Sequence, residues 1–459
     1  MKMNWKRTLT VVPLSAALLL PTATAFADDH GDHGGDGNSM ENAPTVSSPA
    51  ADLRATLDQY LSEHAYLAVF TMQKGIDGSE DFDQIAGALQ QNTEDLTAAI
   101  ESVYGEEAGS MFQEMWENHI GFFVDYVTAT AEGDEAGREE ALTQLDGYRA
   151  DFSEFLEGAT DERLEAGALA EGLQMHVDQL VWAFDQYNEG DFDSAYDNIR
   201  ESIHHMYGVS KGLSTAIVDQ FDEDFEGSMA DTPAADLRSD LNYLFSEHAG
   251  LAVTTMQKGI DGAEDFEAAA GALNDNTEGL TEAISGVYGE EAGDAFNEQW
   301  SEHIDFFVDY VTATAEEDEA GQQEALDNLA GYRDTFSQFL SDATENRLEA
   351  GALADGLQMH VDQLVAAFDS YEAGDYETTY ENVREAYGHM FGVGEMMSGA
   401  IVDQFPENFE SGMPSEMPRT GLGGTSEAAG QTPWYLYSIA VILLASAVVF
   451  MTRRPKVQQ

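Results

Sequence analysis

Histidine is the scarce residue type whose placement could support chemistry in this chain. Only 11 histidines occur among 459 residues, and eight of them recur at a constant shift of 184 positions. The pairs are His64 and His248, His119 and His303, His176 and His360, and His205 and His389. Neutral imidazole is a common ligand of copper, zinc and haem iron. The spacing therefore makes these eight residues candidate metal ligands.

Methionines lie next to two of these histidine positions. Met175 and Met359 precede the third histidine of each set, and Met206 and Met390 follow the fourth. Soft thioether sulfur beside imidazole favours Cu(I) or haem. Together the histidines and methionines predict a copper or haem site in each half of the chain.

The apolar pattern places most of these imidazoles in a protein core. With helical spacing, His64 falls on the same stripe as Leu57, Leu61 and Met72, and the second and third histidines fall on similar stripes. His205 falls beside its apolar stripe rather than on it. Helical bundles build metal and haem sites by projecting one side chain from each of several helices. Four histidines on four predicted helices fit that arrangement.

A purely structural role is the alternative for these residues. Each imidazole could hydrogen-bond a neighbouring carboxylate, with Asp125 and Asp178 near enough in sequence, and the methionines could fill the core. A carboxylate-bridged di-iron site is not indicated, because Glu201 and His204 form a Glu-x-x-His pair whose histidine becomes Gly388 in the second half. Under this alternative the protein is a structural or adhesive surface protein without a ligand.

The histidine positions belong to an internal duplication. Residues 51–222 return as 235–406 without a gap, and 223–234 link them. Helix periodicity with almost no strand-like alternation predicts an all-α fold of two tandem bundles with about six helices each. In the first copy the predicted helices are 52–74, 81–103, 106–132, 134–157, 161–188 and 191–220. One domain of this length is an ordinary size for a helical bundle.

Charge excludes several partners. Residues 28–420 contain 13 Lys and Arg against 86 Asp and Glu, which gives a net charge near −73. Nucleic acid and anionic membrane surfaces are poor partners for such a polyanion. At about 1 M salt the Debye length falls to roughly 3 Å, so the self-repulsion is screened. We therefore interpret the acidity as a halophilic adaptation, with cation attraction as a compatible alternative.

Both ends of the chain carry processing signals. Residues 1–27 read as a secretory signal peptide with a basic start, a short apolar run and Ala25-Phe26-Ala27 at the cleavage site. Cleavage would expose Asp28-Asp29-His30, where a free amine, two amides and the His30 imidazole could bind Cu(II) or Ni(II). The Gly- and Asp-rich segment 28–50 is predicted to be disordered, so His30 could equally belong to a soluble tail.

At the other end, the linker 407–433 leads to a membrane span at 434–451 and a basic cytoplasmic tail at 452–459. The linker contains Met417-Pro418-Arg419-Thr420-Gly421. This order of parts resembles the cell-wall sorting signal of sortase substrates, whose motif is Leu-Pro-x-Thr-Gly, with Met417 in place of leucine. The resemblance implies cleavage after Thr420 and attachment to peptidoglycan, hence a secreted protein anchored at the cell wall or cell surface.

The helical repeat also resembles bacterial surface proteins that are named copper amine oxidase-like. The segments Ser-Glu-His-Ala and Gly-Leu-Gln-Met-His carry that resemblance, but the chain has no His-x-His copper pair. Only copper is carried over from it. Cysteine is absent, and phosphate-loop, nucleophile-elbow and His-Glu-x-x-His motifs are missing. A non-enzymatic ligand-binding protein is therefore favoured over a third reading, a copper- or haem-dependent oxidoreductase.

Overall fold

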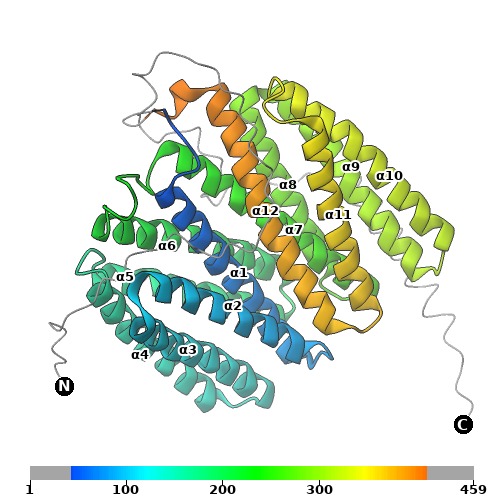
Figure 1. Cartoon of the computed structure of the whole chain (residues 1–459). Helices are drawn as coiled ribbons and strands as arrows, with labels where there is room; N and C mark the ends of the chain where they lie inside the picture. The colour runs from blue at the N-terminus through cyan, green and yellow to red at the C-terminus, as the bar shows by residue number, and fades with distance from the viewer. Residues whose placement is uncertain (1–42, 411–459) are drawn as a thin grey trace, which may run out of the picture. The chain divides into compact units, whose positions relative to one another are not determined.

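The computed structural model describes residues 43–410, and these form twelve α-helices and one short 3-10 helix without any strand (Figure 1). The first repeat contains α1 (Pro49–Asp77), α2 (Phe82–Tyr104), α3 (Glu106–Glu132), α4 (Glu135–Ala159), α5 (Ala166–Glu189) and α6 (Phe192–Gln220). The second contains α7 (Pro233–Asp261), α8 (Phe266–Tyr288), α9 (Glu290–Ala315), α10 (Glu319–Ala343), α11 (Ala350–Glu372) and α12 (Tyr376–Gln404), followed by η1 (Pro406–Asn408). The prediction of an all-α chain with six helices per repeat is confirmed for this range.

The clearest departure from the predicted helices lies before α5. The sequence pattern starts this helix at residue 161, whereas α5 begins at Ala166. Asp161 and Glu162 have φ angles of 52° and 62°, in the left-handed region that a right-handed helix cannot contain. Glu345 and Asn346 repeat this turn in the second copy. The polar residues within 161–165 would also suit the first turn of a helix. Helical periodicity therefore could not show that the chain turns before α5.

The chain divides into two compact units that do not coincide with the repeats. Residues 48–178 and 205–230 form the first unit, and residues 179–204 and 231–410 belong to the second. In the first unit α1 packs on both α2 and α3, and α3 packs on α4. Residues 179–204, which come from the first repeat in sequence, are part of the second unit.

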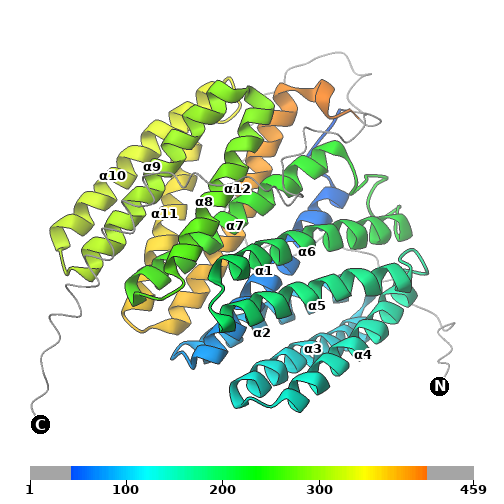
Figure 2. The same ribbon diagram turned by 180° about the vertical axis from the view of Figure 1, so that it is seen from behind.

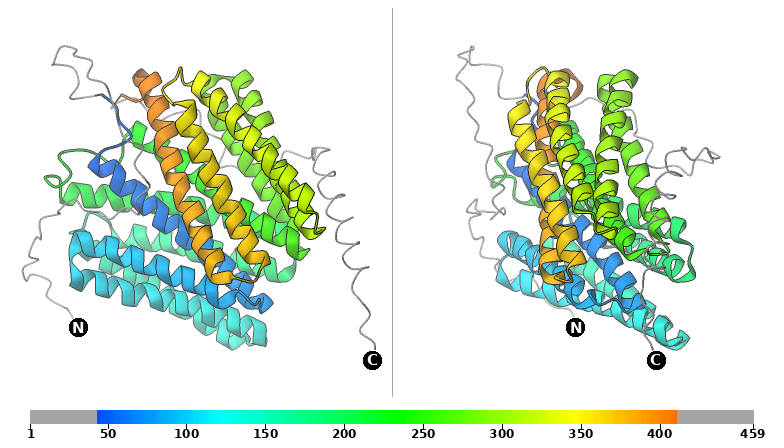
Figure 3. Two further views of the ribbon diagram at one scale, coloured as in Figure 1. Left: turned by 45° about the vertical axis from the view of Figure 1, so that its right-hand side comes forward. Right: turned by 90° about the vertical axis from the view of Figure 1, so that its right-hand side faces the viewer.

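In the second unit α7 is the central helix. It packs against α8, α9, α11 and α12, and it is buried over almost its whole length. Neighbouring helices in the chain pack as pairs: α9 lies beside α10 (Figure 2), and α11 lies beside α12 (Figure 3). Because short loops join them, each helix runs antiparallel to the next. The arrangement brings α7, α9 and α11 to one place in the core.

A buried carboxylate on α7 is held by a dense hydrogen-bond network. The side chain of Glu247 is fully buried, and both of its oxygens accept from the Arg200 guanidinium at 3.2 Å. Asn276 and Tyr243 donate to the same carboxylate at 2.8 Å each. Desolvating a charge is costly unless it is paired and hydrogen-bonded, and here all of these conditions are met.

Several sequence predictions concern residues outside the described range. These are the signal peptide 1–27, His30, the sorting motif 417–421, the span 434–451 and the tail 452–459. Among residues 43–410, no helix is both long and apolar enough to cross a membrane. Pro49 and Ala50, placed by the sequence in the N-terminal acidic segment, are the first residues of α1.

Breaking the Glu247 network should destabilise the second unit strongly. Glu247→Ala removes the fully buried partner of Arg200 and leaves it only the more distant, exposed carboxylate of Asp275 at 3.7 Å, so we expect a loss of about 3 kcal/mol in the free energy of unfolding. The control is Asp403→Asn, which breaks the exposed Arg347–Asp403 pair (2.8 Å) and should cost less than about 1 kcal/mol. Urea denaturation at constant salt measures both, and similar losses in the two variants would contradict the prediction.

Candidate metal centre

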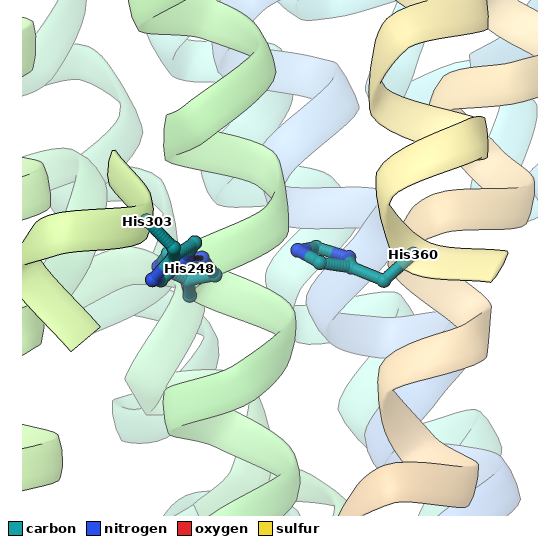
Figure 4. Close-up of side chains that lie close together, drawn as sticks. All are labelled: His248, His303 and His360. Atoms are coloured by element: carbon teal, nitrogen blue, oxygen red, sulfur yellow. Dashed lines mark hydrogen bonds between the residues drawn. The ribbon is translucent and has the colours of Figure 1, made fainter. Parts of the chain in front are cut away.

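Three histidines of the second repeat meet in the core of the unit. His248 comes from α7, His303 from α9 and His360 from α11, and Figure 4 shows His360 reaching from α11 toward the other two rings. The Nε2 atoms of His248 and His303 are 3.4 Å apart, and one ligand atom of each of the three residues lies within 4.8 Å of the others. All three side chains are buried. This His248–His303–His360 group could hold a metal ion.

The first repeat has a similar arrangement, although among the described residues only the second-repeat group has ligand atoms that all lie within 4.8 Å of one another. The Nε2 atoms of His64 and His119 are also 3.4 Å apart. The ring centroids of His64 and His176 are separated by 6.0 Å, compared with 5.9 Å for His248 and His360. We refer to His64, His119 and His176, and to their counterparts, as the histidine triads. Each repeat thus contains one triad built from its first, third and fifth helices.

The distances suit a common ion. Metal–nitrogen bonds of about 2.0–2.1 Å place two imidazole nitrogens roughly 3.3–3.6 Å apart in tetrahedral or trigonal sites. The 3.4 Å separation of the first two nitrogens needs no adjustment. The same separation also permits a long hydrogen bond between the two neutral rings. The geometry is therefore compatible with a bound ion as well as with direct pairing of the rings.

Aromatic rings enclose each triad. Trp116 lies 4.7 Å from His64 and 4.6 Å from His119, measured between ring centroids, and Tyr148 stacks on His119 at 4.7 Å. In the second repeat Trp300 and Tyr332 occupy the same places. Neither Trp116 nor Tyr148 was among the site residues that the sequence predicted. Their role depends on contacts between helices that no spacing within one helix reveals.

The carboxylates that a structural role would require as hydrogen-bond partners do not bond to the Nδ1 atoms of the triad histidines. The Nδ1 atoms of all six triad histidines are buried without a hydrogen-bond partner among the described residues. Asp125 is exposed, and Asp178 accepts a hydrogen bond from Gln174 at 2.7 Å. Burying an unpaired polar group costs about 1–3 kcal/mol. Core histidines satisfied by neighbouring carboxylates do not describe this site.

Burial keeps the triads uncharged. It lowers the pKa of His119 to about 3, reinforced by the nearby His176 and opposed by the backbone of Trp116. Burial also lowers the pKa of His303 to about 3. The pKa values of His64 and His248 are lowered well below 6.5, first by burial and then by neighbouring histidines. The triads are therefore neutral at any ordinary pH, which is the form that binds metals.

The fourth histidine of each predicted set lies outside its triad. His205 and His389 are only partly buried, and their Nε2 atoms lie 3.0 Å and 3.2 Å from the carbonyl oxygens of Gly172 and Gly356. Donation from Nε2 leaves Nδ1 as the only remaining ligand atom of these rings. Neither residue belongs to the group of converging ligand atoms among the described residues, and their assignment as ligands stays a prediction.

The methionines divide into two groups. Met175 and Met359 are 49% and 41% exposed and point away from the core, so their prediction as ligands was wrong. Adjacent residues on a helix differ by about 100° in direction, so a neighbour of an inward-facing histidine turns outward. Met206 and Met390 are buried, and each lines a cavity beside the third histidine of its triad.

Each triad also adjoins a larger cavity on its other side. In the first repeat this cavity is about 480 Å³ and is lined by His64 and His119. The equivalent cavity in the second repeat is about 520 Å³ and is lined by His248 and His303. Carboxylates of Glu302 and Asp305 contribute to the second cavity. These spaces give a small ion a route toward the imidazole nitrogens.

Comparison with known proteins adds no assignment. No protein-family model matches the sequence, and searches of curated proteins and of solved structures give no significant match. The arguments about the site therefore depend on its geometry and chemistry.

The buried neutral histidines predict a pH dependence of stability in metal-free protein. Unfolded histidine titrates near pH 6.5, whereas folded His119 titrates near 3, so the unfolded state binds more protons between these values and stability falls as the pH drops. From pH 6.5 to 5, one such histidine costs about 2 kcal/mol. Between pH 7 and pH 5, the free energy of unfolding of the wild type should fall by about 2 kcal/mol more than that of His119→Phe.

The comparison is made by urea denaturation with a chelator present. Both proteins carry the same carboxylates, so subtracting their profiles removes the contribution of acidic groups. Parallel pH profiles would mean that His119 titrates normally in the folded state.

Proposed function

We propose that this protein is a non-enzymatic surface protein that holds one copper ion, as Cu(I), in each histidine triad. The observation that carries the proposal is the convergence of three buried, neutral imidazoles, two of them already at the nitrogen separation a bound ion requires. Imidazole suits copper and zinc equally, so the choice between them comes from the surroundings.

The composition of the ligand set favours a monovalent ion, because no carboxylate belongs to the converging group. The ligand atoms that converge in the second triad come from histidines alone, and the walls around them are aromatic. The cost of burying an ion rises with the square of its charge, so a divalent ion pays roughly four times the desolvation penalty of a monovalent one. Three neutral nitrogens satisfy Cu(I), which accepts low coordination numbers. The face of an aromatic ring such as Trp300 adds attraction for a cation.

Haem fits these triads less well than a single ion. Haem iron takes axial protein ligands on opposite faces of a wide, flat macrocycle. In each triad three imidazoles surround one point, and two of their nitrogens are 3.4 Å apart. The geometry therefore favours copper over the haem alternative.

The second ring nitrogens indicate how firmly the ion is held. Metal-binding histidines usually donate the other ring N–H to a carboxylate or carbonyl, and losing that partner costs about 10–100-fold in affinity. Here the Nδ1 atoms of the triads are unpartnered, so packing against Trp116, Tyr148 and their counterparts holds the rings. We infer an exchangeable store or buffer of copper rather than a permanent structural site.

The chain ends support a place for this activity outside the cell. We infer that the signal peptide is removed after Ala27 and that a sortase joins Thr420 to peptidoglycan. The sites would then be displayed on a strongly acidic protein that attracts cations from the medium. Sortase and the cell wall are its expected partners.

Copper binding can be tested by anaerobic titration with Cu(I) against a chromophoric chelator. The full mature chain should bind two equivalents. His303→Gln should bind one, because it removes a ligand of the second triad only, and adding His119→Gln should abolish binding. The matched control is His205→Gln, which changes a neighbouring histidine outside the triad and should retain both equivalents.

Other results would redirect the proposal. Tighter binding of Zn(II) than of Cu(I) would reject copper while keeping a metal site. No uptake of either ion by folded protein would leave the structural or adhesive alternative.

Anchoring is tested separately in the native cell. Thr420→Ala should prevent covalent attachment, so that detergent alone extracts the protein from the membrane. Wild type should require a wall-degrading enzyme for release. Detergent extraction of both forms would show that Met417 does not support sorting.

A further inference from the structure

The two repeats differ in the cavity that borders the third histidine of the triad. In the first repeat this cavity is about 290 Å³ and is lined by His119, His176 and Met206, and we call it the chamber. The equivalent space in the second repeat, beside His360 and Met390, is about 50 Å³. The triads themselves are alike, so the difference comes from the surrounding walls.

Three substitutions in the walls accompany the difference in volume. Gly212 lines the chamber, and its counterpart Met396 lines the small cavity of the second repeat. Leu61 is likewise replaced by the larger Phe245, and the third substitution is at Leu213, whose counterpart is Met397. A Cβ atom built on Gly212 would meet no heavy atom within 4 Å, so the space at this position is open. The first repeat therefore keeps a volume that the second repeat fills with its own side chains.

The walls of the chamber are suited to an uncharged apolar molecule. They consist mainly of aliphatic and aromatic side chains, among them Leu57, Ile100, Phe112 and Phe152. Cavities with such walls stay dry, and one of about 150 Å³ is large enough for benzene. A chamber nearly twice that size has room for a bicyclic aromatic. Anions are disfavoured, since the one charged residue of the lining is the acidic Glu165, and the apolar walls disfavour any charged group that is taken out of water.

One polar feature adds selectivity. His119 and His176 line the chamber, and each has a buried Nδ1 atom without a partner. A ligand with a single hydrogen-bonding group, such as the N–H of indole, could satisfy an imidazole nitrogen that water does not reach.

We propose that the chamber of the first repeat is a binding site for one small, uncharged, mostly apolar molecule of about the size of indole, and that the second repeat lacks this site. The proposal does not depend on copper. The ligand is enclosed by side chains, and its site is defined by the glycine at position 212.

The test is isothermal titration calorimetry of the full mature chain with indole and with naphthalene, in the presence of a metal chelator. We expect one molecule bound per chain, with indole favoured over naphthalene because it carries a hydrogen-bonding group. The series Gly212→Ala, Gly212→Leu and Gly212→Met should weaken binding progressively, with a loss of about tenfold or more for methionine.

The second repeat offers the reverse experiment. Met396→Gly combined with Phe245→Leu and Met397→Leu restores the three first-repeat residues and should create a second binding site per chain. The control for methionine in a helix is Gly147→Met, at an exposed position on α4 with open space around it, and it should leave binding unchanged. Circular dichroism checks that each variant is folded.

Two outcomes would overturn the proposal: no binding of either compound by wild type up to its solubility limit, or unchanged affinity in folded Gly212→Met. Either result would leave copper binding unaffected, because the chelator removes metal from every measurement.

Discussion

Burial of three imidazoles at one point is the physical constraint around which each repeat is built. Two of the rings face each other through Nε2, but the Nδ1 atoms of all three are buried without a hydrogen-bond partner among the described residues, and each such atom costs about 1–3 kcal/mol. Stability must come from the aromatic packing around them, which explains why Trp116, Tyr148 and Phe152 form a continuous stack beside His119. A bound ion would convert this local cost into a favourable interaction.

The distribution of charge separates the core from the surface. The mature chain has few basic residues, and several of them neutralise buried acids: Arg200 binds Glu247, while Lys74 and Lys258 each lie 2.8 Å from a buried aspartate. Most other acidic residues of the described range are exposed or partly exposed, with Asp58 and Glu63 among the buried exceptions. The histidine triads are thus neutral groups of ligands inside a strongly acidic protein. Acidic residues would attract cations over long range, whereas the triad histidines would bind the ion directly.

The sequence was informative wherever the physics is local. Helical periodicity predicted α3 at its observed bounds, and stripes of apolar residues correctly placed His64, His119 and His176 in the core. The left-handed turn at Asp161 and Glu162 was not predicted, because the backbone conformation of two polar residues does not alter the spacing of apolar residues. Which histidines converge depends on how helices pack, and single-helix patterns could not separate His176 from His205. The exposure of Met175 could have been predicted, because it adjoins an inward-facing histidine.

The assignment of residues 179–204 to the second unit means that the second repeat is not self-sufficient. Glu247 belongs to the second repeat in sequence, yet the arginine that binds it, Arg200, comes from the first. A chain cut in the linker 223–234 would separate this buried carboxylate from the guanidinium. The second repeat expressed alone would therefore start with an uncompensated charge in its core.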